Sequence, residues 1–366
     1  MSVLWPLEPA TAAKHQLYER YLDAWWPIML QPSQRDGRRL PRVTYLDAFA
    51  GPGRYEGGEE GSPVFALRRL LNHVAVDRMQ LSRGRVRILF MEKRRDRHDY
   101  LRCELDRHFG DLDSLPVSVE VHQAEAGVAA EGLLGSTGAW GYPILAIFDS
   151  WGNVNVPLSL MRKIAGNRSS EVIVTFGPNW FSRRHKLEPD QLDVVFGGRQ
   201  YWEPADQESR PGERWRVWLE TYRDALRRAG FKFQLQFRIV PKTGQPLYLV
   251  YGTGHERGIE VMKDAMWKVD GNNGMGFQDP RTRGAPLSGQ QMLFAGPDDP
   301  ELLELVMQRL AVGPVSLEQL GRWLLVETAR WRSTDARHAI ASLQGDGQIS
   351  ISPAARLTKS SVIRLR

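Results

Sequence analysis

An acid followed by two closely spaced glycines is the first group of residues that could do chemistry. Asp47 ends a short apolar segment, and Ala-Phe49-Ala-Gly51-Pro-Gly53 follows at once. Glycines directly after a strand let the backbone approach a ligand that side chains would hold away. Glu92 ends the next apolar segment, where a carboxylate can accept hydrogen bonds from both hydroxyls of a ribose. These five residues predict a site for an adenosine-containing cofactor, and an ordinary tight turn is the alternative.

The spacing of these residues bears on which cofactor would bind. Asp47 and Glu92 are 92 − 47 = 45 residues apart, whereas about twenty is usual in dinucleotide-binding folds, so an insertion is expected between them. A nicotinamide cofactor favours a third glycine at position 56, which is Glu56 here. S-adenosylmethionine (SAM) is therefore the better fit. Glu125, after a third apolar segment, is expected either near the adenine ring or exposed on a loop.

A second group, Asp149-Ser150-Trp151-Gly152, follows the fourth apolar segment. Methyl transfer to an exocyclic amine needs an oxygen that accepts the amine hydrogens and a flat ring that stacks on the extruded base. Asp149 and Trp151 could serve, and we take Asp149, Ser150 and Trp151 as the candidate catalytic residues. Both prolines of the usual amine-methylating motif are absent. The alternative is that Asp149 caps the next element and Trp151 packs in the core.

Basic residues suggest a polyanionic partner. The formal charge is +6 with a pI near 9.4, and twelve tryptophans supply more flat rings than a core needs, although most should be core anchors. The alternative is a solvated surface on a domain that docks a protein. We expect DNA rather than RNA as the partner, with phosphate contacts from seven positions: Arg183, Arg184, Lys186, Arg330, Arg332, Arg337 and Lys359.

Five apolar segments would position these groups. They are predicted as parallel strands, because continuous apolar runs are typical of a sheet covered on both faces. Two alternating segments joined by residues 242–245 then predict an antiparallel pair. Together they predict an α/β fold with a class I SAM-methyltransferase-like Rossmann sheet, mostly parallel with an antiparallel last strand. The parallel strands are expected at 43–47, 86–91, 117–122, 143–148 and 171–176, and the pair at 231–240 and 246–251.

The chain divides into four parts. Residues 1–40 form a helical extension with apolar residues at helical spacing from Thr11 to Leu30. Residues 41–270 form the Rossmann domain, in which Ser62 is expected to cap a helix, and residues 271–299 form a linker rich in turn residues. Residues 300–366 predict three helices and a two-stranded ribbon, the order of a small winged helix-turn-helix domain.

Composition excludes other classes. No run of 18 apolar residues exists, so no membrane span is expected, and the first residues do not resemble a secretory signal, which favours the cytoplasm. The lone thiol, Cys103, excludes an internal disulfide and a cysteine-rich metal site, and we expect it in the core. No metal site is predicted. His255 could act as a base, although a capping or packing role is the stronger expectation.

Two longer motifs resemble the three-Cys-motif partner (TcmP) family. The first runs from Tyr45 to Glu56 and continues in Gly61-Ser62-Pro63; the second comprises 248–255 and Met262-Lys263-Asp-Ala-Met-Trp267-Lys268. The resemblance covers nearly the whole chain. It implies a methyltransferase-like Rossmann domain, a C-terminal winged helix and a separately encoded radical SAM-type partner carrying three cysteines. Where the family tends to have Asp-Pro-Phe-Gly, this chain has Ser150 and Trp151.

Two functions follow as hypotheses. The first is a SAM-dependent methyltransferase-like protein acting on nucleic acid, with an amino group of a base as the candidate target. The second is a non-catalytic or regulatory DNA-binding subunit of the three-cysteine partner, acting in DNA repair or modification.

Overall fold

The computed structural model describes residues 2–33, 36–184, 188–208, 210–271, 273–282, 299–353 and 357–366. Its centre is an eight-stranded sheet in the order β3-β2-β1-β4-β5-β7-β6-β8, in which β7 is antiparallel to both of its neighbours and every other pair is parallel. This topology confirms the predicted methyltransferase-like Rossmann sheet. The strands are β1 (Val43–Asp47), β2 (Val86–Glu92), β3 (Ser118–Gln123), β4 (Ile144–Gly152), β5 (Glu171–Phe176), β6 (Phe233–Val240), β7 (Leu247–Thr253) and β8 (Gly276–Gln278).

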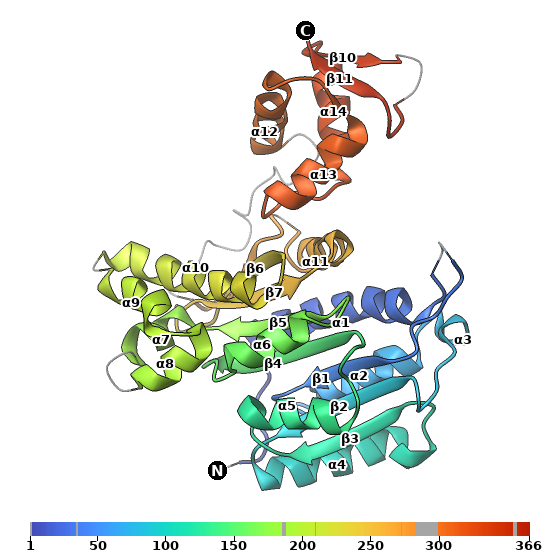
Figure 1. The fold of residues 1–366 in the computed structure, drawn as a ribbon, viewed down its shortest axis with the longest axis vertical. Coiled ribbons are helices and arrows are strands. Elements are labelled where there is room, and N and C mark those ends of the chain that lie inside the picture. Colours follow the sequence, from blue (N-terminus) through green and yellow to red (C-terminus); the bar gives the residue numbers. More distant parts are fainter. Residues whose placement is uncertain are drawn as a thin grey trace.

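Helices cover both faces of the sheet, because successive side chains of each buried strand point to opposite sides (Figure 1). One face packs against α1 (Pro9–Leu30), α2 (Ser62–Leu71), α3 (Val76–Met79), α4 (Arg95–Phe109) and α11 (Glu256–Val269). The other packs against α5 (Ala126–Ser136), α6 (Leu158–Ala165), α7 (Pro178–Arg184), α8 (Pro189–Phe196), α9 (Arg199–Gln207) and α10 (Pro211–Ala229). A short 3-10 turn, η1 (Leu112–Ser114), precedes β3.

Helix α1 belongs to the sheet domain rather than to a separate extension. Its apolar stripe buries Leu17, Tyr21, Trp25 and Trp26 almost completely, and it packs beside α2 and α11. Burying such aromatic side chains contributes strongly to stability because each removes a large apolar area from water. Helix α1 therefore completes one face of the sheet.

Several local predictions need correction. Gly61, not Ser62, is the N-cap of α2, and the Ser62 hydroxyl donates to Asp47 instead. Cys103 is exposed on α4, because at that position the helix turns its polar face outward between buried Leu101 and Leu105. The helices α7, α8 and α9 were not predicted. They lie between β5 and α10, in a segment interrupted by Pro189, Gly197 and Pro204.

The C-terminal domain has its own core and stands beside α11, away from the sheet (Figure 1). It contains α12 (Pro300–Ala311), α13 (Leu317–Glu327) and α14 (Asp335–Gly345), with β9 (Val315–Ser316), β10 (Ile349–Ser352) and β11 (Val362–Leu365). The sheet has three strands rather than two, in the antiparallel order β10-β11-β9. Ser316 caps α13, as expected. Assignment to the winged-helix class stays a prediction.

The predicted linker is partly structured. Strand β8, at Gly276–Gln278, extends the sheet by pairing with β6. Residues 283–298 lie outside the described part of the chain. Within the described residues, no helix has the length and apolar character needed to cross a membrane.

Candidate functional site

Asp47 lies at the carboxyl end of β1, at the edge of the parallel strands where ligands of such sheets collect. Its side chain is buried. The Ser62 hydroxyl donates to Asp47 Oδ2 at 2.6 Å, and the Phe49 amide donates to Oδ1 at 3.2 Å. Burial raises the pKa of Asp47 to about 6, although both hydrogen bonds act in the opposite direction. A buried carboxyl group therefore fixes the turn after β1.

Glu92 closes the turn from the neighbouring strand. Strands β1 and β2 pair directly, and the Gly51 amide donates to Glu92 Oε2 at 3.1 Å, while the Arg94 amide donates to Oε1 at 2.7 Å. The carboxyl ends of β1 and β2 thus bring together four of the predicted cofactor residues: Asp47, Phe49, Gly51 and Glu92. In this state the Glu92 oxygens accept backbone hydrogen bonds that a ribose would share or replace.

The two glycines of the turn have different roles. Both have positive φ, +65° at Gly51 and +80° at Gly53, a region that favours glycine. A Cβ on Gly51 would face Trp5 at 3.7 Å, on the cavity side. A Cβ on Gly53 would meet Leu101 Cδ1 at 2.8 Å, so Gly53 is needed for packing against α4 rather than for approach to a ligand.

Glu125 follows β3, and the backbone there is tied to β2 because the Ala124 amide donates to the Glu92 carbonyl at 3.1 Å. Its side chain is 60% exposed and forms an ion pair with Lys93 at 2.9 Å. The exposed-loop alternative therefore describes Glu125 in this state.

Asp149 is surrounded by donors that sequence reasoning missed. Lys14 Nζ lies 2.9 and 2.7 Å from the two Asp149 oxygens, the Thr175 hydroxyl donates to Oδ1 at 2.6 Å, and the Tyr18 hydroxyl to Oδ2 at 3.3 Å. Burial acts to raise the pKa of Asp149, but the charge and hydrogen bonds of Lys14 outweigh it and hold that pKa below its usual value. The sequence shows Lys14 as a charged residue at helical spacing from apolar Leu17, but no pattern in it pairs Lys14 with Asp149.

Trp151 projects from an irregularity at the end of β4. The pairing of β4 with β5 shifts register between Phe148 and Gly152, and Trp151 adopts φ +56°, an uncommon conformation for a bulky residue. Its ring is 45% exposed, with Lys14 Nζ 4.3 Å from the ring centroid. The hydroxyl oxygen of Ser150, the third predicted catalytic residue, is buried without a hydrogen-bond partner in the described chain.

The space between these groups is small. A cavity of about 50 Å³ lies among Asp47, Gly51, Lys14, Asp149 and Trp151, whereas ligand pockets usually start at about 300 Å³. Trp5 lies over Gly51, and its carbonyl accepts from the Glu56 amide at 3.1 Å. The N-terminal segment therefore lies beside Gly51 and narrows the space at the predicted cofactor site.

A second cavity, of about 280 Å³, opens on the other side of Trp151. Two exposed tryptophans, Trp151 and Trp180, line it together with Pro246 and Leu247. Asn179 Nδ2 donates to Gln245 Oε1 at 2.5 Å at its rim. Flat rings on a partly apolar cavity are suited to a planar ring of a ligand.

The predicted phosphate-binding residues separate into two groups. Arg330 pairs with Asp299 and Glu301, and Arg332 pairs with Asp335. Both guanidinium groups therefore have carboxylate partners within the protein, and their contact with phosphates stays a prediction. Arg183, Arg337 and Lys359 are exposed. The Arg184 side chain and Lys186 lie outside what the structure describes. No cluster of three or more metal-ligating side chains occurs among the described residues.

No protein-family model matches the chain, and no curated protein is similar to it at a significant level. Solved structures with a similar fold include Trm1 from Pyrococcus horikoshii in complex with S-adenosyl-L-methionine, with 10% identity, a TM-score of 0.40 and coverage of 99% of this chain and 91% of that one. The N-terminal domain of EvdMO1 with SAH bound has 14% identity, a TM-score of 0.33 and coverage of 69% and 83%. This chain covers 48% of the longer EvdMO1 chain.

Proposed function

We propose that this protein is a SAM-dependent methyltransferase acting on nucleic acid. The observation that carries the proposal is the meeting of Asp47, Gly51 and Glu92 at the carboxyl ends of β1 and β2, beside Asp149 and Trp151. A carboxylate at the tip of β2 suits the two hydroxyls of a ribose, and the positive φ of Gly51 keeps the backbone accessible to the methionine end. These donors and acceptors match the hydrogen-bonding groups of the cofactor. The cavity beside Gly51 would hold the cofactor only after the Trp5 side chain moves aside.

When bound, SAM would supply an electrophilic methyl group to a nucleophilic nitrogen. The chain's own contribution is alignment and exclusion of water. Asp149 would accept hydrogen bonds from the target amine in place of Lys14, and Trp151 would stack on the ring that carries it. The cavity between Trp151 and Trp180 supports a flat acceptor such as a nucleobase, and exposed Arg183 lies on the same helix as Trp180.

Calorimetric titration of SAM tests the cofactor site. We expect binding to the wild type and about a ten- to hundred-fold loss in Glu92→Ala, because hydrogen bonds to a charged group contribute about 1.5–3 kcal/mol. Glu304→Ala, an exposed change in the C-terminal domain, is the matched control. Trp5→Ala should strengthen binding several-fold, because the cost of displacing the indole is removed. Absence of binding to both the wild type and Trp5→Ala would contradict the proposal.

Radiolabelled SAM with DNA and RNA pools tests the reaction. Label is expected in nucleic acid with the wild type and not with Trp151→Ala. Label in neither pool, despite SAM binding, would remove the nucleic-acid assignment while leaving the cofactor site in place.

One observation favours a second function. Lys14 occupies both oxygens of Asp149, and the remaining cavity holds only about 50 Å³, which suits a non-catalytic or regulatory subunit with a closed site. In that case the protein would bring a three-cysteine radical SAM-type partner to DNA. Copurification of such a partner with the tagged wild type, together with no SAM binding, would favour this function over the first.

A further inference from the structure

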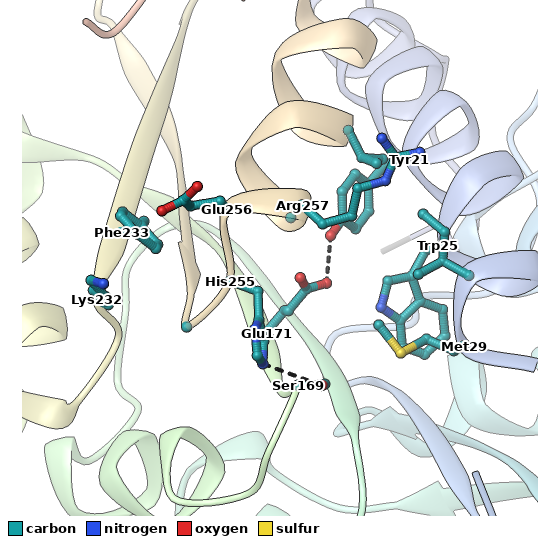
Figure 2. Close-up of a pocket in the computed structure, with 14 residues that line it drawn as sticks. Tyr21, Trp25, Met29, Ser169, Glu171, Lys232, Phe233, His255, Glu256 and Arg257 are labelled. Carbon is teal, nitrogen blue, oxygen red and sulfur yellow. Dashed lines mark hydrogen bonds between the residues drawn. The ribbon is translucent and has the colours of Figure 1, made fainter. Parts of the chain in front are cut away.

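A further cavity, shown in Figure 2, lies at the opposite end of the sheet from Asp47 and Asp149. It holds about 560 Å³, within the range of about 300–1,000 Å³ typical of small-molecule sites. Figure 2 shows its walls: Tyr21, Trp25 and Met29 come from α1, and Lys232 and Phe233 come from the start of β6. Glu171, the first residue of β5, and His255 lie between them. No step of the proposed methyl transfer uses this cavity.

The walls combine an apolar surface with polar and charged side chains. Trp25, Met29, Phe233 and Val261 line the cavity, and Ile28 is 40% exposed on the same face. The exposed isoleucine and the aromatic side chains beside it form an apolar surface of the protein. An apolar ligand that covers this surface would remove it from water. A planar or branched apolar body therefore suits this space.

A buried carboxyl group forms the floor. Glu171 is 3% exposed and lies within hydrogen-bond distance of three hydroxyls: Tyr21, Tyr251 at 2.7 Å and Thr253 at 3.0 Å. The two tyrosine oxygens are also 2.8 Å apart. Burial raises the pKa of Glu171, although the hydroxyl groups that donate to it act in the opposite direction. The three hydroxyls satisfy the buried carboxyl group, so the floor of the cavity needs no polar partner from a ligand.

The charges around the mouth leave one cation in excess. Arg257 pairs with Glu260 at 2.5 Å, and Glu256 pairs with Arg322 at 2.6 Å. In the described part of the chain, the Lys232 ammonium has no carboxylate at ion-pair distance; it lies 4.9 Å from the Phe233 ring centroid. Its charge contributes to the lowered pKa of Glu256, behind the hydrogen bonds of Arg322. A single anionic group on a ligand would balance Lys232.

A polar pair, Ser169 and His255, lies at the solvent-exposed rim of the cavity. Ser169 adopts φ +62°, rare for a residue other than glycine. Its hydroxyl and His255 Nε2 are 3.3 Å apart, as the dashed line in Figure 2 shows. Such strain is concentrated at ligand sites, where a fixed hydroxyl is held in place for a partner.

We propose that this cavity is a second binding site, for a small molecule with a planar aromatic body and one anionic group such as a carboxylate or sulfonate. The ring would lie between Trp25 and Phe233 above Glu171, and the anion would face Lys232. This inference does not depend on the methyltransferase proposal.

Two fluorescent probes with nearly the same ring system test the site. 8-Anilinonaphthalene-1-sulfonate carries one anionic group, and N-phenyl-1-naphthylamine carries none. We expect the full-length protein to bind one sulfonate probe with enhanced emission. Lys232→Gln should weaken the sulfonate probe about three-fold, as expected for an exposed ion pair, and leave the neutral probe unchanged. Lys268→Gln, an exposed change on α11 outside the lining of this cavity, is the matched control.

Filling the cavity provides the decisive variant. A side chain at Gly254 would meet nothing within 4 Å of its Cβ, so Gly254→Trp can enter the cavity without disturbing the core, and it should abolish binding of both probes. Val261→Phe, which narrows the same space, is the second variant should the first fail to fold. Unchanged binding of the sulfonate probe in either folded variant would overturn the proposal. Equal weakening of both probes by Lys232→Gln would overturn the anionic ligand class.

Discussion

At the scale of single residues, Asp47 links the candidate site to stability. Burial raises its pKa from 3.8 to about 6. The folded protein therefore holds this proton more tightly than the unfolded chain does. The resulting stabilisation is fully present below pH 3.8 and is lost as the pH rises through about 6. At 1.36 kcal/mol per pKa unit, the loss amounts to about 3 kcal/mol.

Asp47→Asn should remove this pH dependence, because an amide does not titrate. Between about pH 3.5 and pH 8, the wild-type free energy of unfolding should fall by about 3 kcal/mol relative to the variant, as measured by urea unfolding at each pH. Asp77→Asn, an exposed change, should behave as the wild type does. If the free energies of unfolding of the wild type and Asp47→Asn changed in parallel with pH, the pKa of Asp47 would be the same in the folded and unfolded protein, which would contradict this prediction.

At the scale of elements, α1 is joined to the end of β4 by a buried ion pair. Lys14 is 1% exposed, and its ammonium lies 2.7 Å from Asp149. Removing one partner of such a pair leaves an uncompensated buried charge, which costs about 3–5 kcal/mol. Lys14→Met should therefore destabilise the protein by that amount.

The double variant Lys14→Met with Asp149→Asn should recover most of the loss, because neither charge remains and the amide oxygen introduced at position 149 would still accept a hydrogen bond from Thr175. Urea unfolding of the two single variants and the double variant measures the coupling. Additive losses would mean that the two side chains act independently. Additive losses would also weaken the proposal that the Lys14 side chain moves away from Asp149 when a target amine binds.

The sequence predicts these elements unevenly, for physical reasons. The strands were recoverable because buried parallel strands are continuous apolar runs, and β1 and β5 have the predicted bounds. The turn after β1 and the position of Glu92 could also be predicted, because each lies at the end of an apolar strand that is visible in the sequence. Trp5 over Gly51 and Lys14 on Asp149 are contacts between distant segments, so no local pattern predicts them.

The irregular end of β4 was also beyond prediction. The pattern placed the strand end at Phe148, but β4 continues to Gly152 through a register shift. A bulge depends on pairing with a neighbouring strand, which the local sequence does not encode. In the sequence, Trp151 is therefore only an aromatic residue shortly after an acid. Its exposed position between two cavities depends on the irregular pairing of β4 with β5.

At the scale of the whole molecule, the second family-like motif, which contains Lys263 and Trp267, holds the two domains together. The Trp267 indole donates to the Arg330 carbonyl at 2.9 Å, and the Arg332 guanidinium lies 4.9 Å from the Trp267 ring centroid. These contacts make Arg330 and Arg332 part of the interface between the two domains. They also show that a charged cluster in a sequence can belong to an internal interface.

Lys263 is the most buried part of that interface. It is fully buried on α11, and its ammonium donates to the carbonyls of Leu325, Thr328 and Trp331 at 2.6–2.8 Å, with Leu324 at 3.3 Å. The end of α13 thus has its last carbonyls satisfied by a side chain from the other domain. Lys263→Met would remove this donor from the carbonyls of Leu325, Thr328 and Trp331, at a cost of about 1–3 kcal/mol each before relaxation. The Leu324 carbonyl would still accept from the Thr328 hydroxyl.

We therefore expect Lys263→Met to separate the domains rather than unfold the sheet. Calorimetry should show one cooperative transition in the wild type and two in the variant, and amide exchange should accelerate in α13 and α14 but not in β1 or β4. Lys268→Met, an exposed change on the same helix, should keep the wild-type behaviour. Because Asp47 and Asp149 lie at the carboxyl ends of the central strands β1 and β4, away from Lys263, SAM binding should survive in Lys263→Met. A single, equally cooperative transition in that variant would mean that apolar packing alone joins the domains.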